Sequence, residues 1–149
     1  MKKFPVHFAP SLIQKIETSS APNWADALHD WHYLGDPEKN FGRDVSNARD
    51  STNTWAWHVH MAPEDQNAIE KWDRINLAFR RTSDRLLVYS MDKQVPERYG
   101  ILLLAFLTPN GHDQLIRGAS AAQRRSDWED IAYTHQYTGN MPQGTFSFK

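Results

Sequence analysis

The chain has 149 residues, a net charge of -1 and 6 tryptophan, 5 tyrosine and 7 phenylalanine residues, which favour one packed domain over a disordered segment. The absence of cysteine excludes disulfide bonds and thiolate metal sites. The longest apolar run, Ile101 to Leu107, is too short to cross a bilayer, and no signal-peptide pattern follows Met1, so we expect a cytoplasmic protein without a membrane partner.

The first part of the chain predicts a short strand followed by two helices. Phe4 to Phe8 is the expected strand, and the spacing of apolar residues predicts a helix over Ser11 to Thr18. A second helix begins at Ala21 to Asn23, where the asparagine can cap it, and ends at Gly35. The polar, turn-rich segment from Glu38 to Asn53 predicts a loop.

The middle of the chain predicts the strands of a small sheet. Trp55 to Met61 has the composition of a strand, and Pro63 to Asp65 opens a helix with a proline and two acids near its start. Leu86 to Met91 and Tyr99 to Thr108 are apolar runs joined by a short polar link. They predict an antiparallel hairpin.

The last part predicts one helix over residues 114–133 and an irregular tail over residues 138–149. The order is helices, then a small antiparallel sheet, then a helix, which is typical of an α+β domain. We therefore expect a single domain over residues 1–149, with its core at about residues 21–135 and helices flanking the sheet.

Two histidines stand one residue apart in the strand expected at Trp55 to Met61. Residues i and i+2 of a strand point to the same face, so His58 and His60 should lie side by side. Imidazole titrates near neutral pH and suits both general acid and general base chemistry. The alternative is that one histidine faces the core or makes a structural hydrogen bond.

Basic residues concentrate in one part of the chain. Residues 71–125 hold ten Lys/Arg and five Asp/Glu, a local charge of +5. A locally basic face can hold phosphates, although ordinary clustering of charge on a solvated surface is the alternative. Arg81 is the best candidate to grip two phosphate oxygens and Arg43 the next, with salt bridges to Asp84 and Asp44 as alternatives.

Four further polar residues accompany these candidates. Thr82 can donate a hydrogen bond to phosphate or cap a turn, and Arg80 belongs to the same basic segment. Tyr89 can stack on a base, donate a proton or pack on the sheet. His112 follows the end of an expected strand, where loops often carry function, and is a candidate second acid or phosphate contact.

Four ordered blocks within residues 25–125 carry a resemblance to a known family. They are Phe41-Gly42-Arg43-Asp44, His58-Val59-His60-Met61-Ala62, Phe79 with Arg81-Thr82-Ser83-Asp84 and Leu87-Val88-Tyr89, and Leu102 to Pro109 followed by His112 and Arg117. Together they resemble the YafO family, the toxin half of a bacterial type II toxin–antitoxin pair. The resemblance implies a fold similar to the small RelE-like ribonucleases, an endoribonuclease that cuts mRNA on the ribosome and arrests growth, and a cognate antitoxin.

Two other functions stay open from the residues. A metal-dependent hydrolase would use His58, His60 and His112 as ligands, but no acidic residue stands at a convincing position to complete the site. A non-catalytic RNA- or protein-binding module would use the basic segment as its docking face. We expect RNA cleavage by attack of a ribose 2′-OH, without a metal ion or cofactor. The expected catalytic residues are His58, His60, Arg81, His112 and Tyr89. The expected substrate-binding residues are Arg43, Thr82, Arg117 and Arg80.

Overall fold

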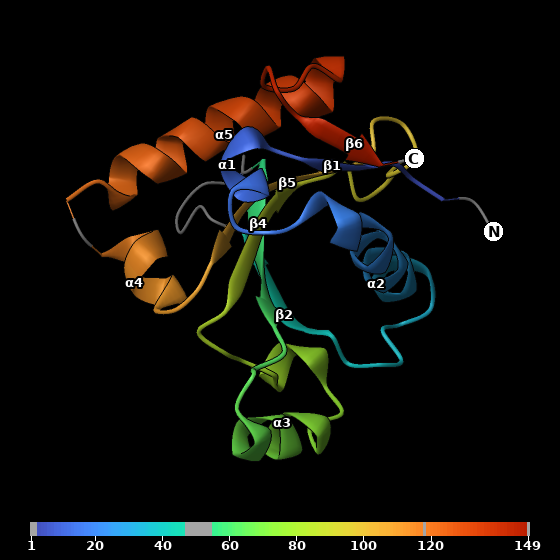
Figure 1. The fold of residues 1–149 in the computed structure, drawn as a ribbon, viewed down its shortest axis with the longest axis vertical. Coiled ribbons are helices and arrows are strands. Elements are labelled where there is room, and N and C mark those ends of the chain that lie inside the picture. Colours follow the sequence, from blue (N-terminus) through green and yellow to red (C-terminus); the bar gives the residue numbers. More distant parts are fainter. Residues whose placement is uncertain (1–2, 47–54, 118, 149) are drawn as a thin grey trace.

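The protein is organised around a six-stranded sheet with the strand order β2-β3-β4-β5-β1-β6 (Figure 1). The structure is a computed structural model that describes residues 3–46, 55–117 and 119–148. The strands are β1 (Val6–Phe8), β2 (Phe41–Ser46), β3 (Ala56–Met61), β4 (Leu86–Ser90), β5 (Ile101–Leu107) and β6 (Phe146–Phe148). The helices are α1 (Pro10–Ile13), α2 (Ala21–Tyr33), α3 (Gln66–Asp73), α4 (Gly111–Ile116) and α5 (Ala121–Thr138), with short 3-10 turns η1 (Thr18–Ser20) and η2 (Ala78–Arg80).

The sheet is antiparallel except at one pair of strands. β2, β3, β4 and β5 pair antiparallel in sequence order, as do β1 and β6. β1 pairs parallel with β5, so the first strand of the chain lies between β5 and β6 in the sheet. The expected α+β class and the antiparallel hairpin of β4 and β5 are confirmed, and the parallel pair is an addition to the expected sheet.

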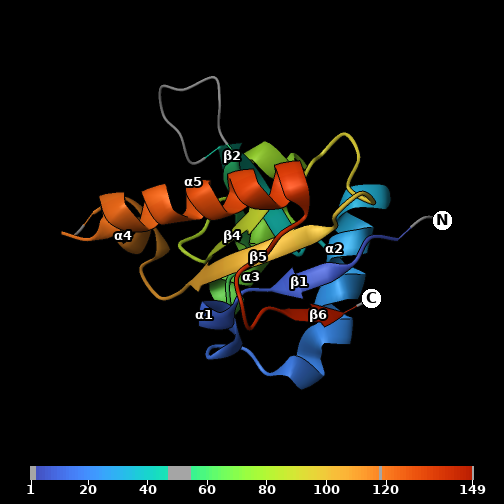
Figure 2. The same ribbon diagram turned by 90° about the horizontal axis from the view of Figure 1, so that it is seen from above.

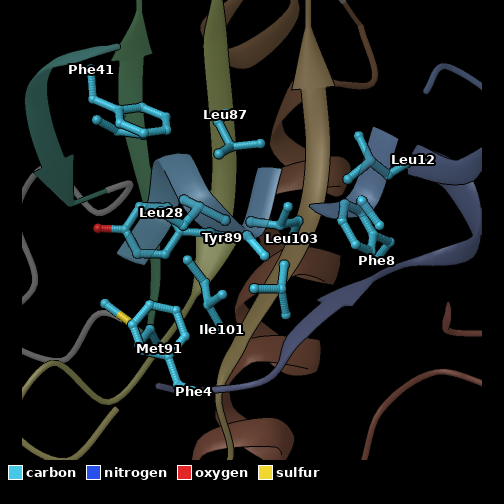
Figure 3. Close-up of a cluster of buried hydrophobic side chains, with 14 residues drawn as sticks. Phe4, Phe8, Leu12, Leu28, Phe41, Leu87, Tyr89, Met91, Ile101 and Leu103 are labelled. Carbon is cyan, nitrogen blue, oxygen red and sulfur yellow. The ribbon is translucent and has the colours of Figure 1, made fainter. Parts of the chain in front are cut away.

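Helices cover both faces of the sheet (Figures 1 and 2). α1 and α2 lie on one face, and α4 and α5 lie on the other. Buried side chains on the α2 side form a cluster, shown in Figure 3, that includes Leu28 of α2, Val59 of β3 and Tyr89 of β4. A second cluster on the α5 side includes Trp128 of α5 and Ala56 of β3. Alternate residues of β3 therefore enter different cores, because successive side chains of a strand point to opposite faces.

A segment expected to be a loop forms the edge strand β2. Phe41 enters the α2-side core, and the buried carboxylate of Asp36 accepts the backbone N–H groups of Asn40 at 3.0 Å and of Phe41 at 2.8 Å. An edge strand needs few apolar side chains, so the polar composition of β2 does not distinguish it from a loop in the sequence. The rest of the expected loop, residues 47–53, lies outside the described residues.

The tail expected to be irregular over residues 138–149 contains the second edge strand, β6. Phe146 and Phe148 pack against the α2-side core while the strand pairs with β1. A strand of three residues is too short to show a clear alternation in the sequence. The core therefore extends on both sides of residues 21–135.

Helix boundaries also differ from those expected. The helix expected over Ser11 to Thr18 is the shorter α1 followed by η1. α2 starts at Ala21 with no side-chain cap, so Asn23 lies inside its first turn. α3 starts after Asp65, whose carboxylate caps the helix by accepting a backbone N–H at 3.0 Å. The helix expected over residues 114–133 is two helices, since Arg117 has extended backbone angles and ends α4. No helix in the described ranges has the length and apolar composition needed to cross a bilayer.

Arg81 fastens the turn η2 to the edge strand β2. Its guanidinium donates to the carbonyl of Phe41 from Nε at 3.1 Å and from Nη2 at 3.0 Å, and to the carbonyl of Ile75 from Nη1 at 2.9 Å. The backbone N–H of Arg43 donates to the Arg81 carbonyl at 2.9 Å. A Cβ atom at Gly42 would lie 2.2 Å from that carbonyl oxygen, so only glycine permits this approach.

Replacing Arg81 with lysine should therefore destabilise the fold. A lysine ammonium keeps the charge but cannot reach carbonyls on two separate segments at once, which leaves a buried acceptor without a donor. We expect Arg81→Lys to lower the free energy of unfolding by about 2 kcal/mol or more. The exposed neighbour provides the control, because Arg80→Lys should change stability by less than about 0.5 kcal/mol. Equal urea midpoints for the two variants would contradict this structural role.

Candidate functional site

His58, His60 and His112 form a row of three rings on the α5 side of the sheet, which we call the histidine row. His58 and His60 alternate with Val59 of β3 and share the face of Ala56, as their spacing predicted. Their ring centroids lie 5.9 Å apart, and the rings of His60 and His112 lie 5.1 Å apart. Residues from β3 and α4 are thereby brought together across the sheet.

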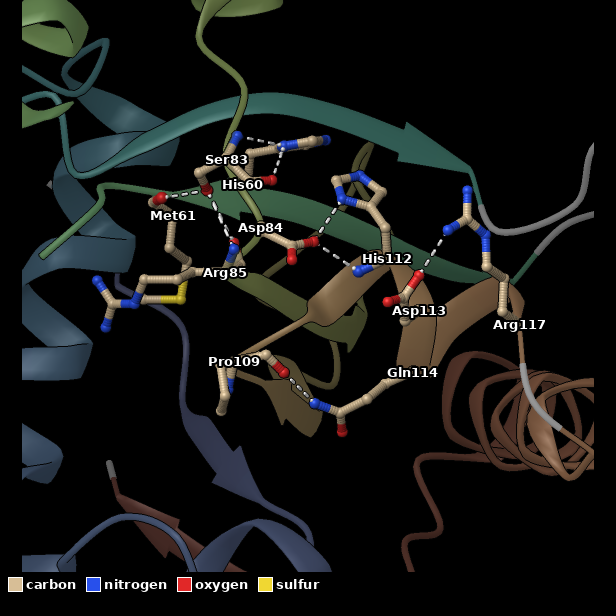
Figure 4. Close-up of polar contacts among 10 residues, drawn as sticks. All are labelled: His60, Met61, Ser83, Asp84, Arg85, Pro109, His112, Asp113, Gln114 and Arg117. Carbon is tan, nitrogen blue, oxygen red and sulfur yellow. Dashed lines mark hydrogen bonds and ion pairs between the residues drawn. The ribbon is translucent and has the colours of Figure 1, made fainter. Parts of the chain in front are cut away.

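His112 is held in place by Asp84, which precedes β4 (Figure 4). One carboxylate oxygen accepts both Nδ1–H and the backbone N–H of His112, each at 2.8 Å. The backbone N–H of Gly111 donates to the Asp84 carbonyl at 2.9 Å, so the start of α4 is bound to this one residue. The chain reaches this position through Asn110, which adopts the left-handed conformation after β5 ends.

The contact with Asp84 places a proton on one ring nitrogen of His112. A carboxylate can only accept, so Nδ1 is the donor in this hydrogen bond and Nε2 is the other ring nitrogen. Among the described residues, no hydrogen bond to Nε2 of His112 is present. The His112 side chain is 43% exposed and that of Asp84 53%, so this pair is open to solvent.

His60 is oriented by the backbone of Ser83. The Ser83 N–H lies 2.9 Å from Nδ1 of His60, and the Ser83 carbonyl lies at the same distance from that nitrogen. The Ser83 hydroxyl in turn donates to the carbonyl of Met61 at 2.6 Å. These contacts join the end of β3 to the segment before β4 and set the plane of the His60 ring against His112 (Figure 4).

Burial keeps two of the three imidazoles neutral at pH 7. His58 is 8% exposed and His60 only 3%. Burial, followed by the positive charge that His60 and His112 would carry, lowers the pKa of His58 from 6.5 to about 4. Burial, His112 and Arg43 lower the pKa of His60 to about 4, although the Ser83 contact and Asp84 oppose the shift. Hydrogen bonds from His112 lower the pKa of Asp84, so its carboxylate is ionised.

Arg43 is the cation beside the histidine row. It stands on β2, and its charge is one cause of the lowered pKa of His60. Its Nε donates to the carbonyl of Phe79 at 2.8 Å, and its guanidinium carbon lies 4.2 Å from the centre of the Phe79 ring. The alternative of a salt bridge between Arg43 and Asp44 does not form, because Asp44 accepts from Tyr89 and Lys93 on the other face of β2.

Three expected site residues lie away from the row. Tyr89 is fully buried on the α2 side, where its hydroxyl donates to Asp44 at 2.7 Å, and burial raises its pKa well above the usual range. Arg81 is buried, and its guanidinium donates to the backbone carbonyls of Phe41 and Ile75. These carbonyls occupy the position around the guanidinium where a phosphate was expected. Arg117 makes an exposed ion pair with Asp113 one turn away on α4.

Two further residues are defined only by the structure. Asp84 was a candidate partner for Arg81, but it binds His112, which is distant from it in the sequence. Phe79 belongs to one of the four blocks that resemble the family, but no local sequence pattern predicts its exposure or its contact with Arg43. Thr82 and Arg80 are exposed on the same segment, next to Phe79 and Arg81.

The described residues contain no group of three or more His, Asp or Glu side chains arranged to hold a metal ion. The ring centroids of His58 and His60 lie 5.9 Å apart and those of His60 and His112 lie 5.1 Å apart, so neighbouring imidazoles are close enough for the charge of one to act on another.

Comparison with known proteins gives one family match. A family model described as toxin YafO of a type II toxin–antitoxin system matches residues 29–137, well over half of the chain. The match includes the histidine row, Asp84, Arg43 and Phe79. No curated protein and no solved structure matches the chain.

The neutral histidines should make the fold sensitive to acid. The unfolded chain takes up protons on His58 and His60 below pH 6.5, whereas the folded protein does so only near pH 4. The free energy of unfolding should therefore fall as the pH decreases from 6.5 to 4, by roughly 2 kcal/mol for each histidine. NMR titration of the ring protons checks this directly, and midpoints near 6.5 for these two rings would contradict it.

Tyr89→Phe should reduce stability without changing the histidine row. The substitution removes a buried hydrogen bond to Asp44 and should cost about 1 to 2 kcal/mol in denaturant unfolding. His58 and His60 lie on the opposite face of the sheet, so their NMR titration curves should not move. A shifted midpoint for either ring would instead connect Tyr89 with the row.

Proposed function

The chain belongs to the YafO family of toxins from type II toxin–antitoxin systems, and on that basis we propose that it is a cytoplasmic endoribonuclease that cuts mRNA on the ribosome and so arrests translation. A type II system implies a cognate protein antitoxin, and mRNA is the proposed substrate. The observation that carries the enzymatic part of this proposal is the contact of Asp84 with His112, with neutral His60 behind the ring and Arg43 beside it.

The required chemistry has three parts. A base accepts the proton of a ribose 2′-OH, the oxygen attacks the adjacent phosphorus, and the 5′-oxygen leaves with a proton. The products are a 2′,3′-cyclic phosphate and a 5′-hydroxyl. Negative charge develops on the phosphate during this step, so a nearby cation lowers the barrier.

His112 fits the role of the base in this proposal. Its half-exposed ring is accessible to a polymer, whereas His58 and His60 are nearly buried. Asp84 holds Nδ1–H and would stabilise the imidazolium that forms when Nε2 accepts the proton. His60 at 5.1 Å is neutral and adds no positive charge that would oppose this step.

Arg43 fits the role of the phosphate cation, and solvent supplies the proton of the leaving group. Its Nε is occupied by the Phe79 carbonyl, which fixes the guanidinium plane while the terminal nitrogens carry the remaining donors. Arg43 lies on β2 between the strand pairs Phe41–Met61 and Asp44–Val59, so it stands opposite His60 of β3, and the His112 ring lies 5.1 Å from the His60 ring. A phosphate bound next to His60 would therefore be near both the base and the cation.

Variants of His112 and Asp84 test the proposal. His112→Ala should reduce cleavage of ribosome-bound mRNA by about 10²- to 10⁴-fold and abolish growth arrest, because the base is lost. Asp84→Asn should give a smaller loss, since an amide oxygen can still accept Nδ1–H but stabilises the imidazolium less. Gln123→Ala, which removes only an exposed hydrogen bond to Asp127 on α5, should leave activity unchanged.

Substrate chemistry separates the alternatives. Cleavage should continue in excess EDTA when ribosome integrity is controlled, and a 2′-deoxy nucleotide at the cut site should block it. Chelator-sensitive cleavage of the deoxy substrate would show a metal-dependent hydrolase. Full growth arrest by a folded His112→Ala variant, without RNA cleavage by the wild type, would show a non-catalytic binding module.

A further inference from the structure

Phe79 is an exposed aromatic ring on a rigid support. Its side chain is 70% exposed, which is the largest exposure among the large apolar residues of the described ranges. The guanidinium of Arg43 lies 4.2 Å from the ring centre and also donates to the Phe79 carbonyl, so one residue holds both the ring and its backbone. The adjacent Arg81 fastens the turn η2 to β2. An exposed aromatic ring that a guanidinium holds in one place can stack on an external group without first becoming ordered.

The position of Phe79 relates it to the histidine row. Arg43 contacts Phe79 at one end of the proposed site and lies opposite His60 on the neighbouring strand, between the pairs Phe41–Met61 and Asp44–Val59. His60 in turn lies against His112. The order along the surface is therefore aromatic ring, cation, neutral imidazole and proposed base.

We propose that Phe79 stacks on a nucleobase of the RNA next to the phosphate that is cut, and that this contact positions the RNA strand at the site. This inference rests on the proposed function and deepens it. Single-stranded nucleic acids are bound by aromatic rings that stack on bases and by cations that hold the backbone, and base–aromatic stacking is worth about 10- to 100-fold in affinity. Arg43 would connect the two features, because its guanidinium lies over one face of the Phe79 ring and also provides a cation for the phosphate.

The surroundings of Phe79 favour RNA over a protein partner. Arg80, the next residue in the chain, is exposed, and so is Arg74, the residue that follows α3. A ring with a guanidinium on one face and arginines nearby suits a polyanion with flat bases. An antitoxin that uses Phe79 as an apolar anchor is the competing reading, and the experiment below distinguishes the two.

Single-turnover cleavage of an mRNA on programmed ribosomes tests the inference. Phe79→Ala should raise the toxin concentration that gives half-maximal rate by about 10-fold or more, while Phe79→Trp should keep the wild-type value. Leu77→Ala is the matched control, because Leu77 is exposed on the same segment but has no aromatic ring. Melting temperatures of the three variants should stay close to that of the wild type.

An abasic nucleotide placed in turn at each position around the cut identifies the stacked base. At one position the abasic substitution should weaken the wild type to the level of Phe79→Ala and have no further effect on that variant. Phe79→Ala activity within twofold of the wild type would overturn the stacking role alone. Unchanged cleavage combined with lost affinity for the antitoxin would assign Phe79 to the protein partner. A wild type that does not cleave would overturn both the proposed function and this inference.

Discussion

The guanidinium of Arg81 determines where one side of the candidate site lies. It is 3% exposed, and it carries a full charge whose hydrogen bonds in the structure all go to backbone carbonyls. Charge-assisted hydrogen bonds compensate for the cost of burying this cation only while Phe41 and the segment after α3 stay in place. Because the Arg81 backbone also pairs with Arg43, the edge strand and η2 behave as one unit. The placement of Arg43 and Phe79 depends on this unit.

The histidine side of the site depends on how much of each imidazole is exposed to solvent. His58 and His60 are on a sheet face that α5 also covers, so they lose much of their hydration and stay neutral. His112 is at the start of α4, where the chain is exposed and an ionised Asp84 replaces part of the solvent. The row therefore joins buried neutral rings to an accessible ring with a carboxylate partner. The proposal of His112 as the base follows from this difference in exposure, because its ring is the one that a polymer can reach.

Much of the fold follows from local patterns. The strand at Trp55 to Met61 and the hairpin of β4 and β5 were predicted because apolar, β-branched runs between turn residues give a strong signal. β2 and β6 were missed because edge strands are short and partly polar, and the pairing partner of β6 is at the opposite end of the chain. The boundary between α4 and α5 was missed although Gly118 is a residue type that ends helices and Ser120 is one that starts them.

The sequence by itself determined that His58 and His60 share a face, because strand periodicity is a local property of the backbone. It also carried the ordered blocks from which the family could be named. Only the tertiary structure decided that Asp84 binds His112, that Arg81 is buried and that Tyr89 is on the opposite face. The local sequence determines which donors, acceptors and charges each residue carries. The partner that each group meets depends on contacts between segments far apart in the chain, which form only when the sheet and its helices pack together.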